Sequence, residues 1–338
     1  MIDKAIEDIL EGDDLSLDTA RSVMMEMMEG KASDAQIGAF LVAMRMKGES
    51  IEEITACAKV MREKSLRLNP THDVLDIVGT GGDGLFSFNI STVSSFVTAA
   101  GGIQVAKHGG RSVSSKCGSA DVLEALGANI SLDAAQSEQV LKKTGMCFLL
   151  AQVYHTAMKH VAPVRRELGV RTLFNILGPL ANPAGAQLQL LGVYDENLVE
   201  PLANVLNNLG VKRAMVVHGH DGLDELTMTG SSTICEASAG RINSYFITPE
   251  QFGLKLCSLE DLKGGGPQEN AEIARSILAG EPGPKRDTVV LNAACCLYLG
   301  NNTMTMRECV ALAQELIDSG AALRKMQDFI QATNEMAA

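Results

Sequence analysis

The stretch LDIVGTGGDGLFSFNISTVSSFVTAAGGIQVAKHGGRSVSSKCGSADVLEALG, residues 75–127, contains one pattern twice. Each copy has a short apolar run, then a polar glycine-rich loop, then a segment whose apolar residues have helical spacing. The first run covers residues 74–78 and its loop 79–84, and the second run covers 103–106 and its loop 107–116. The pattern predicts two successive strand–loop–helix units.

Such a unit can hold an anion, because glycine lets the backbone approach a ligand and the first N–H groups of a helix are unpaired. Neither loop has the spacing GxxxxGK[ST] or GxGxxG. The second loop concentrates basic side chains and hydroxyl donors, namely Lys107, Arg111, Lys116, Ser114, Ser115 and Ser119. One glycine loop is often only a tight turn. Two in succession, one of them basic, favour a site for a ligand with several phosphate groups.

The length of 338 residues favours two unequal domains. Residues 1–70 show only helical patterns, whereas strands and helices alternate from about residue 74. The expected helix starts in the first part are Ser16 and Asp18, Ser33 and Asp34, and Ser50. Further strands are expected at 147–151, 188–193 and 213–217, an antiparallel pair at 234–237 and 242–247, a loop at 152–155, and three or four closing helices after residue 269. The expected class is α/β, with a small N-terminal all-helical domain and a larger α/β domain that has a mostly parallel central sheet.

The composition argues against several classes of partner. The net charge is −12 and no long basic run is evident, so neither nucleic acid nor a membrane surface is expected. No apolar segment is long enough to span a bilayer, and the acidic N-terminus does not resemble a signal peptide. The eight cysteines are scattered without a C-x-x-C motif, which favours reduced thiols and a cytoplasmic location.

Three motifs carry a family resemblance. GTGGD at 79–83, NIST at 89–92 and KHG-x-RSVSSK-x-GSADVLEALG at 107–127 closely resemble the anthranilate phosphoribosyltransferases, and the resemblance covers nearly the whole chain. It implies transfer of the phosphoribosyl group of phosphoribosyl pyrophosphate (PRPP) to the amine of anthranilate, with Mg²⁺ and release of pyrophosphate, in tryptophan biosynthesis. It also implies a homodimer formed through the helical domain.

The resemblance further implies a domain division that follows the chain discontinuously. The helical domain would comprise residues 1–70 and a returning segment, 159–186, whereas residues 73–158 and 187–338 would form the α/β domain that binds PRPP.

The resemblance assigns the donor site mainly to the first loop and the start of the helix after it. The positions that match family contacts with PRPP are Gly79, Gly81, Gly82, Asp83, Asn89, Ser91, Thr92, Lys107 and Ser119. The metal would be held by Ser91, Asp224 and Glu225. Mg²⁺ takes one or two carboxylates together with phosphate oxygens, and this acidic pair follows an expected strand. Judged from the residues alone, a solvated acidic turn is the alternative.

The acceptor needs a partner for its carboxylate and a flat slot for its ring. The positions that match family contacts with anthranilate are Gly79, His108, Gly110, His155 and Arg165. The guanidinium of Arg165 can bind a carboxylate through two parallel hydrogen bonds, and the neighbouring Arg166 is the alternative. Lys107 and His108 are the candidate catalytic residues. Because an aromatic amine is uncharged at neutral pH, His108 is expected to orient the acceptor rather than to serve as an essential base.

Three positions depart from the family pattern. Gly110 stands where asparagine is usual, and Gln152 and Thr156 stand where proline is frequent. The change at Gly110 bears on loop ordering and acceptor affinity, and it leaves the phosphate and metal residues in place.

Two other functions fit the same fold. A pyrimidine nucleoside phosphorylase has a different glycine loop and lacks the acidic pair. A non-catalytic relative that binds nucleic acid should have a basic groove, which the charge of −12 opposes.

Overall fold

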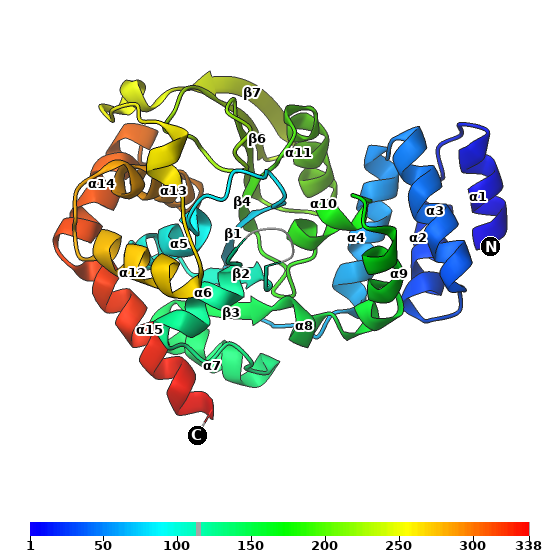
Figure 1. Ribbon diagram of the computed structural model, residues 1–338, viewed down its shortest axis with the longest axis horizontal. Helices are drawn as coiled ribbons and strands as arrows, with labels where there is room; N and C mark the ends of the chain where they lie inside the picture. The colour runs from blue at the N-terminus through cyan, green and yellow to red at the C-terminus, as the bar shows by residue number, and fades with distance from the viewer. Residues whose placement is uncertain (113–115, 338) are drawn as a thin grey trace.

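The computed structural model describes residues 1–112 and 116–337 of the chain. An N-terminal helical unit, α1 to α4, stands beside a larger α/β unit that ends with α15 (Figure 1). The helical unit consists of α1 (Ile2–Leu10), α2 (Leu17–Met28), α3 (Asp34–Lys47) and α4 (Ile51–Lys64). The side chains of Ser16, Ser33 and Ser50 cap α2, α3 and α4, as predicted. The fold class expected from the sequence is therefore confirmed for this part.

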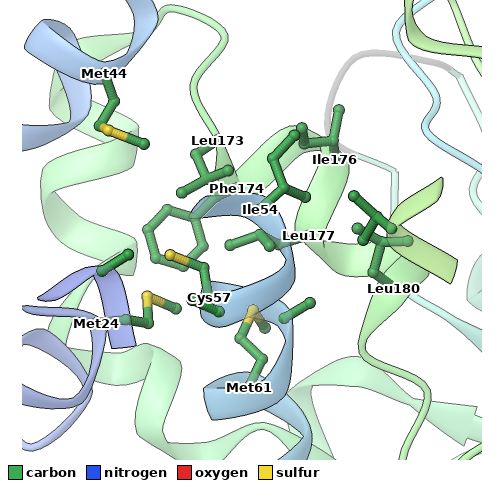
Figure 2. Packing of buried hydrophobic residues seen from close by; sticks show 14 of the residues in the cluster. Met24, Met44, Ile54, Cys57, Met61, Leu173, Phe174, Ile176, Leu177 and Leu180 are labelled. Carbon is green, nitrogen blue, oxygen red and sulfur yellow. The ribbon is translucent and has the colours of Figure 1, made fainter. Parts of the chain in front are cut away.

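Two later helices return to the helical unit. The segment after the third strand forms α8 (Ala151–Tyr154), α9 (Ala162–Leu168) and α10 (Phe174–Leu180). Helix α9 contacts α3, and α10 contacts α4. Apolar side chains of both segments form one buried cluster (Figure 2): Leu173, Phe174, Ile176, Leu177 and Leu180 pack with Met24, Met44, Ile54, Cys57 and Met61. The methionines are thus core side chains, which suits their adaptable shape.

Seven strands form a single sheet in the order β3-β2-β1-β4-β5-β6-β7. They are β1 (Leu75–Gly79), β2 (Val105–Gly109), β3 (Met146–Leu150), β4 (Leu188–Gly192), β5 (Arg213–Gly219), β6 (Ser232–Ser238) and β7 (Arg241–Ile247). The first five strands are parallel, and β6 and β7 add an antiparallel edge. The mostly parallel sheet is confirmed.

The strand order indicates where a ligand is expected to bind. The chain runs outward from β1 to β2 and β3, then returns to the other side of β1 with β4, so the order reverses between β1 and β4. In open α/β sheets, ligands bind beyond the carboxyl ends of the strands at such a reversal. The two glycine loops that follow β1 and β2 begin at this edge.

Helices cover the sheet and fill the rest of the α/β unit (Figure 1). They are α5 (Ile90–Ala100), α6 (Ser119–Leu126), α7 (Ala134–Thr144), α11 (Val199–Asn208), α12 (Pro267–Leu278), α13 (Pro284–Gly300), α14 (Met306–Asp318) and α15 (Ala321–Ala337). Most of the loop expected at 152–155 is instead helical, as part of α8. Tyr154 is buried there, and its hydroxyl donates to Ser137 Oγ at 2.8 Å. Within the described residues, no helix has the length and apolarity needed to cross a membrane.

Candidate active site

The first glycine loop packs directly on the predicted metal pair. The backbone N–H of Gly81 donates to Asp224 Oδ2 at 2.6 Å, and Gly81 has a φ of +67°. A Cβ built on Gly79 would overlap the Asp224 carboxylate, and one built on Gly192 would overlap the Asp224 backbone oxygen. The close approach of β1, β4 and the acidic pair therefore requires glycine at both strand ends.

The acidic pair is buried beside further charge. Asp224 and Glu225 are 9 % and 8 % exposed, so they do not form a solvated turn. Burial and the Asp83 carboxylate raise the pKa of Asp224, and burial with the charges of Asp224 and Asp83 raises the pKa of Glu225. The first loop thus brings three acidic side chains together, and their repulsion falls when a cation is present.

Lys107 occupies the floor of the same site. Its side chain is 2 % exposed, and Nζ donates to the Ile77 backbone oxygen at 2.5 Å and to Ser91 Oγ at 3.2 Å. Burial lowers the pKa of Lys107, whereas Asp76 and the acidic pair oppose that shift. Ser91 and Lys107, predicted from separate motifs, are therefore in direct contact.

The acidic group suits Mg²⁺ better than a metal that needs a complete protein cage. Within residues 1–112 and 116–337, no three acidic, histidine or cysteine side chains are grouped to hold a metal ion by themselves. Mg²⁺ keeps waters and shares oxygens with substrate phosphates, so one or two carboxylates are sufficient. Two buried acids with raised pKa values meet that requirement.

Helix α5 adds hydroxyl and amide groups at its N-terminus. Asn89 precedes the helix, and Ser91 and Thr92 lie in its first turn. Thr92 is 1 % exposed, and its Oγ1 has no hydrogen-bond partner among the described residues. A buried unpaired hydroxyl at the positive end of a helix is suited to phosphate oxygens.

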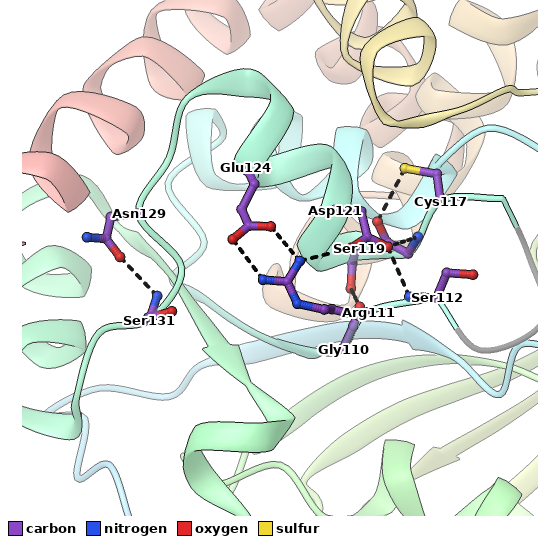
Figure 3. Close-up of polar contacts among 10 residues, drawn as sticks. Gly110, Arg111, Ser112, Cys117, Ser119, Asp121, Glu124, Asn129 and Ser131 are labelled. Carbon is purple, nitrogen blue, oxygen red and sulfur yellow. Dashed lines mark hydrogen bonds and ion pairs between the residues drawn. The ribbon is translucent and has the colours of Figure 1, made fainter. Parts of the chain in front are cut away.

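The second loop is tied back to α6 (Figure 3). Arg111 pairs with Glu124 at 2.5 Å and Asp121 at 3.2 Å, and the backbone N–H of Gly118 donates to Asp121 at 2.8 Å. The Arg111 charge, expected to serve a ligand, is therefore directed at α6 in this structure. Ser119 lies at the start of α6, with Oγ 3.4 Å from the Gly110 backbone oxygen. The predicted donors Ser114 and Ser115 lie outside the described residues.

Two histidines form the next part of the site. The rings of His108, at the end of β2, and His155, after α8, have centroids 5.0 Å apart. Both side chains are buried, and His108 Nε2 and both ring nitrogens of His155 lack hydrogen-bond partners within the described chain. Burial, together with the neighbouring ring, lowers the pKa of His108 to about 3, and burial lowers that of His155 to about 4. Both imidazoles are therefore neutral at pH 7.

Arg165 extends from α9 in the returning segment. Its side chain is partly buried, whereas that of Arg166 is exposed, which favours Arg165 of the two. The guanidinium lies 5.2 Å from the centroid of the Phe174 ring, and burial lowers its pKa. Within the described residues it has no ion-pair partner and no hydrogen bond to either histidine.

The sequence interpretation missed two residues that hold these parts together. Asp76 is fully buried in β1, and its Oδ1 accepts from the backbone N–H of His108 at 3.1 Å. Burial raises the pKa of Asp76 to about 6. A single acidic residue within an apolar run, such as Asp76, could have indicated this role from the sequence.

Arg171, in the returning segment, donates to the backbone oxygen of Gly82 and stacks on Tyr194 with 4.1 Å from Cζ to the ring centroid. No local pattern marks it in the sequence. It links the segment that carries Arg165 to the first glycine loop.

Comparison with known proteins agrees with this geometry. The sequence profile described as "Glycosyl transferase family, a/b domain" matches residues 71–323, and "Glycosyl transferase family, helical bundle domain" matches residues 3–65. The anthranilate phosphoribosyltransferase of Endomicrobium trichonymphae is 64% identical over 99% of this chain and 100% of its own length. The chain belongs to the anthranilate phosphoribosyltransferase family.

Solved structures of the family superpose closely on the fold. The Thermus thermophilus anthranilate phosphoribosyltransferase has a TM-score of 0.93 at 44% identity, and the match covers 98% of this chain and 99% of that one. The Saccharomyces cerevisiae enzyme in complex with PRPP and Mg has a TM-score of 0.90 at 28% identity, and the match covers 99% and 98% of the two chains. Another structure of the yeast family member contains 4-fluoroanthranilate, with a TM-score of 0.88.

Proposed function

We propose that this chain transfers the phosphoribosyl group of PRPP to the amino group of anthranilate and releases pyrophosphate. The observation that carries the proposal is the buried acidic pair packed on the GTGGD loop at the reversal of strand order. A site with two buried carboxylates, a buried lysine and the positive end of a helix is suited to a metal-bound polyphosphate donor. The yeast family member in complex with PRPP and Mg supports the choice of donor, and the yeast structure with 4-fluoroanthranilate supports the choice of acceptor.

The donor site is assigned to the first loop and its neighbours. We place PRPP against Gly79, Gly81, Gly82, Asp83, Asn89, Ser91, Thr92, Lys107 and Ser119. Asp224 and Glu225, with Ser91, would hold Mg²⁺, which supplies charge neutralisation for the departing pyrophosphate. Lys107, whose ammonium is fixed by Ile77 and Ser91, adds positive charge at the same place without needing to reorganise.

The acceptor site is assigned to Gly79, His108, Gly110, His155 and Arg165. Arg165 would bind the carboxylate of anthranilate, and the neutral rings of His108 and His155 would line the slot for its ring. His108 has an unpaired Nε2 that can orient the amine. Catalysis then rests on positioning and charge stabilisation rather than on a covalent enzyme intermediate.

We also propose a domain division with residues 1–70 and 159–186 in the helical domain and residues 73–158 and 187–338 in the α/β domain. The contacts of α9 and α10 with α3 and α4 support it. We further propose a homodimer through the helical domain, which leaves Leu10 and Met46 70 % and 81 % exposed in the single chain. A cytoplasmic location and the absence of nucleic-acid or membrane partners remain expectations from the composition.

The loss of anthranilate fluorescence on addition of PRPP and Mg²⁺ tests the reaction directly. Metal-dependent loss that EDTA stops would establish donor, acceptor and metal together. If fluorescence is unchanged while calorimetry shows PRPP binding, the acceptor assignment is wrong. If PRPP does not bind at all, the proposed function fails.

A further inference from the structure

A third glycine loop, residues 263–266, lies against residues 86–88, which connect the first glycine loop to α5. The backbone N–H of Gly264 donates to the Phe86 oxygen at 2.9 Å, and that of Phe88 donates to the Leu262 oxygen at 3.1 Å. A Cβ built on Gly264 would lie 2.6 Å from Phe88 Cα. The third loop therefore clamps the backbone that leads from GTGGD to α5, and it can do so only with glycine at this position.

A chain of side-chain amides continues from this clamp. The backbone N–H of Gly265 donates to Asn270 Oδ1 at 2.8 Å, and Asn270 Nδ2 donates to Asn89 Oδ1 at 2.9 Å. Asn89 Nδ2 then donates to the Cys117 backbone oxygen at 3.0 Å, at the end of the basic loop. Asn270 is 3 % exposed, so this chain runs through the interior.

The direction of each bond in this chain is fixed. The Gly265 N–H can only donate, so the amide oxygen of Asn270 must face it and its NH₂ group must face Asn89. The amide oxygen of Asn89 is then the acceptor, and its NH₂ group points at the Cys117 carbonyl, which can only accept. The chain thereby sets which way the Asn89 amide points, directly before α5, and it fastens the start of α6 to the start of α5.

We propose that Asn270 is a positioning residue for the PRPP site, and that it acts by orienting Asn89 and by holding the ends of the two phosphate-binding loops together. The inference deepens the proposed function and rests on it for the identity of the ligand. Asn270 is not among the residues proposed to contact PRPP or anthranilate. Its effect should therefore appear on the donor side and leave the acceptor side unchanged.

Asn270→Asp is the sharpest variant. A carboxylate can still accept from Gly265 N–H, but it cannot donate to Asn89, so the two facing oxygens repel. Loss of one buried hydrogen bond beside a binding site predicts a roughly tenfold rise in the KM for PRPP. The KM for anthranilate should change less than about twofold, because Asn270 contacts no part of that site.

Two variants of neighbouring residues serve as controls. Gly264→Ala should reproduce the donor defect, since the new Cβ would meet Phe88 and Asn270 Oδ1 at 2.6 Å each. Gly266→Ala in the same loop should not, because Gly266 has a φ of −72° and no atom within 4 Å of an added Cβ. Equal KM values for Asn270→Asp and Gly266→Ala, or an equal rise for both substrates, would overturn the proposal. Should Gly264→Ala fail to fold, the comparison of Asn270→Asp with Gly266→Ala decides alone.

A measurement without substrate separates this inference from the proposed function. The Cys117 side chain is 6 % exposed, and burial raises the pKa of its thiol to about 11, so labelling by a thiol reagent should be slow. Because Asn270 also hydrogen-bonds the Cys117 thiol, the variant to label is Gly264→Ala. In a Cys257→Ser background, which removes the one cysteine that is not buried, it should label several-fold faster than Gly266→Ala. Equal rates would refute the tie between the loops. If labelling differs but the wild-type protein shows no turnover with PRPP and anthranilate, the tie stands and the proposed function fails.

Discussion

The proposed donor and acceptor halves of the site differ in how far their polar groups already have protein partners. In the donor half, charged and amide groups already have protein partners: Asp224 is bound by Gly81, Lys107 by Ile77 and Ser91, and Asn89 by Asn270 and Cys117. In the acceptor half, polar atoms stand without partners: among described residues, Nε2 of His108, both ring nitrogens of His155 and the guanidinium of Arg165. The polar groups of the first half are therefore held in place before a highly charged ligand binds. Those of the second half would gain partners only when a ligand binds.

The largest effect is expected where the donor half concentrates charge. Asp224→Asn combined with Glu225→Gln should lower kcat by roughly a thousandfold or more, because metal stabilisation of a departing polyphosphate is worth several kcal/mol. The variant should not lower Tm, since it removes two repelling carboxylates that are less than 10 % exposed. Steady-state turnover with varied Mg²⁺ and differential scanning calorimetry measure the two quantities.

A single-site control sharpens that test. Asp261→Asn, at an exposed acid in the same α/β unit, should leave the Mg²⁺ dependence unchanged. Wild-type turnover in the double variant would refute the metal assignment. A large drop in Tm would contradict the view that the two buried carboxylates repel each other in the folded chain.

A smaller and one-sided effect is expected in the acceptor half. Arg165→Ala should raise the KM for anthranilate about tenfold to a hundredfold, since a charge-assisted hydrogen bond contributes about 1.5–3 kcal/mol. The KM for PRPP should stay within about twofold. Arg166→Ala is the matched control, because that side chain is exposed on the same helix. A rise of equal size for both substrates would place Arg165 in a general structural role instead.

The residues of the proposed donor half are easier to find in the sequence than those of the proposed acceptor half, for a physical reason. The donor motifs are local: GTGGD and NIST follow one strand, and the positive φ of Gly81 favours glycine at that position in the sequence. The acceptor half is assembled from β2, α8 and α9, so no spacing in the sequence relates its members. Without the family resemblance, neither Arg165 nor His155 would have been grouped with His108 in one proposed site.

The contacts between segments far apart in the sequence were the hardest to predict. Arg171 reaches Gly82 across 89 residues of sequence, and Asn270 reaches Asn89 across 181. Both residues lie in segments whose local pattern indicates only a turn or a helix start. Tertiary packing decides these pairs, and a single sequence contains no record of it.

A modest gain is expected at the position where this chain departs from its family. Gly110→Asn should lower the KM for anthranilate a few-fold by adding an amide near the open half of the site. The structure has room for it: Gly110 does not have a positive φ, and the atoms nearest an added Cβ are 4.0 Å away, on Ala151 and Gln152. Initial rates at low anthranilate measure the change, with Gly110→Ala separating the amide from the backbone effect. A higher KM for the asparagine variant would mean that the loop needs glycine here.

The smallest effect concerns pH, and it tests whether the histidines of the proposed acceptor half are uncharged. Because His108 and His155 have pKa values of about 3 and 4, both stay neutral between pH 6 and 8, and the KM for anthranilate should not vary through their titration. Stability behaves differently: the unfolded chain takes up protons near the ordinary histidine pKa of about 6.5, and the folded chain does so only near 3 to 4.

The two histidines therefore contribute a fall in the free energy of unfolding as pH decreases from 7 to 5, and Asp76, Asp224 and Glu225, whose pKa values burial raises, oppose it by taking up protons in the folded chain. His155→Gln should reduce that fall, whereas His72→Gln, at an exposed histidine, should not. Urea unfolding at the two pH values gives the difference for each variant. An inflection in the KM for anthranilate near pH 6.5 that His155→Gln abolishes would show that this ring is charged when the acceptor binds, and the acceptor half would then be preorganised by charge as the donor half is.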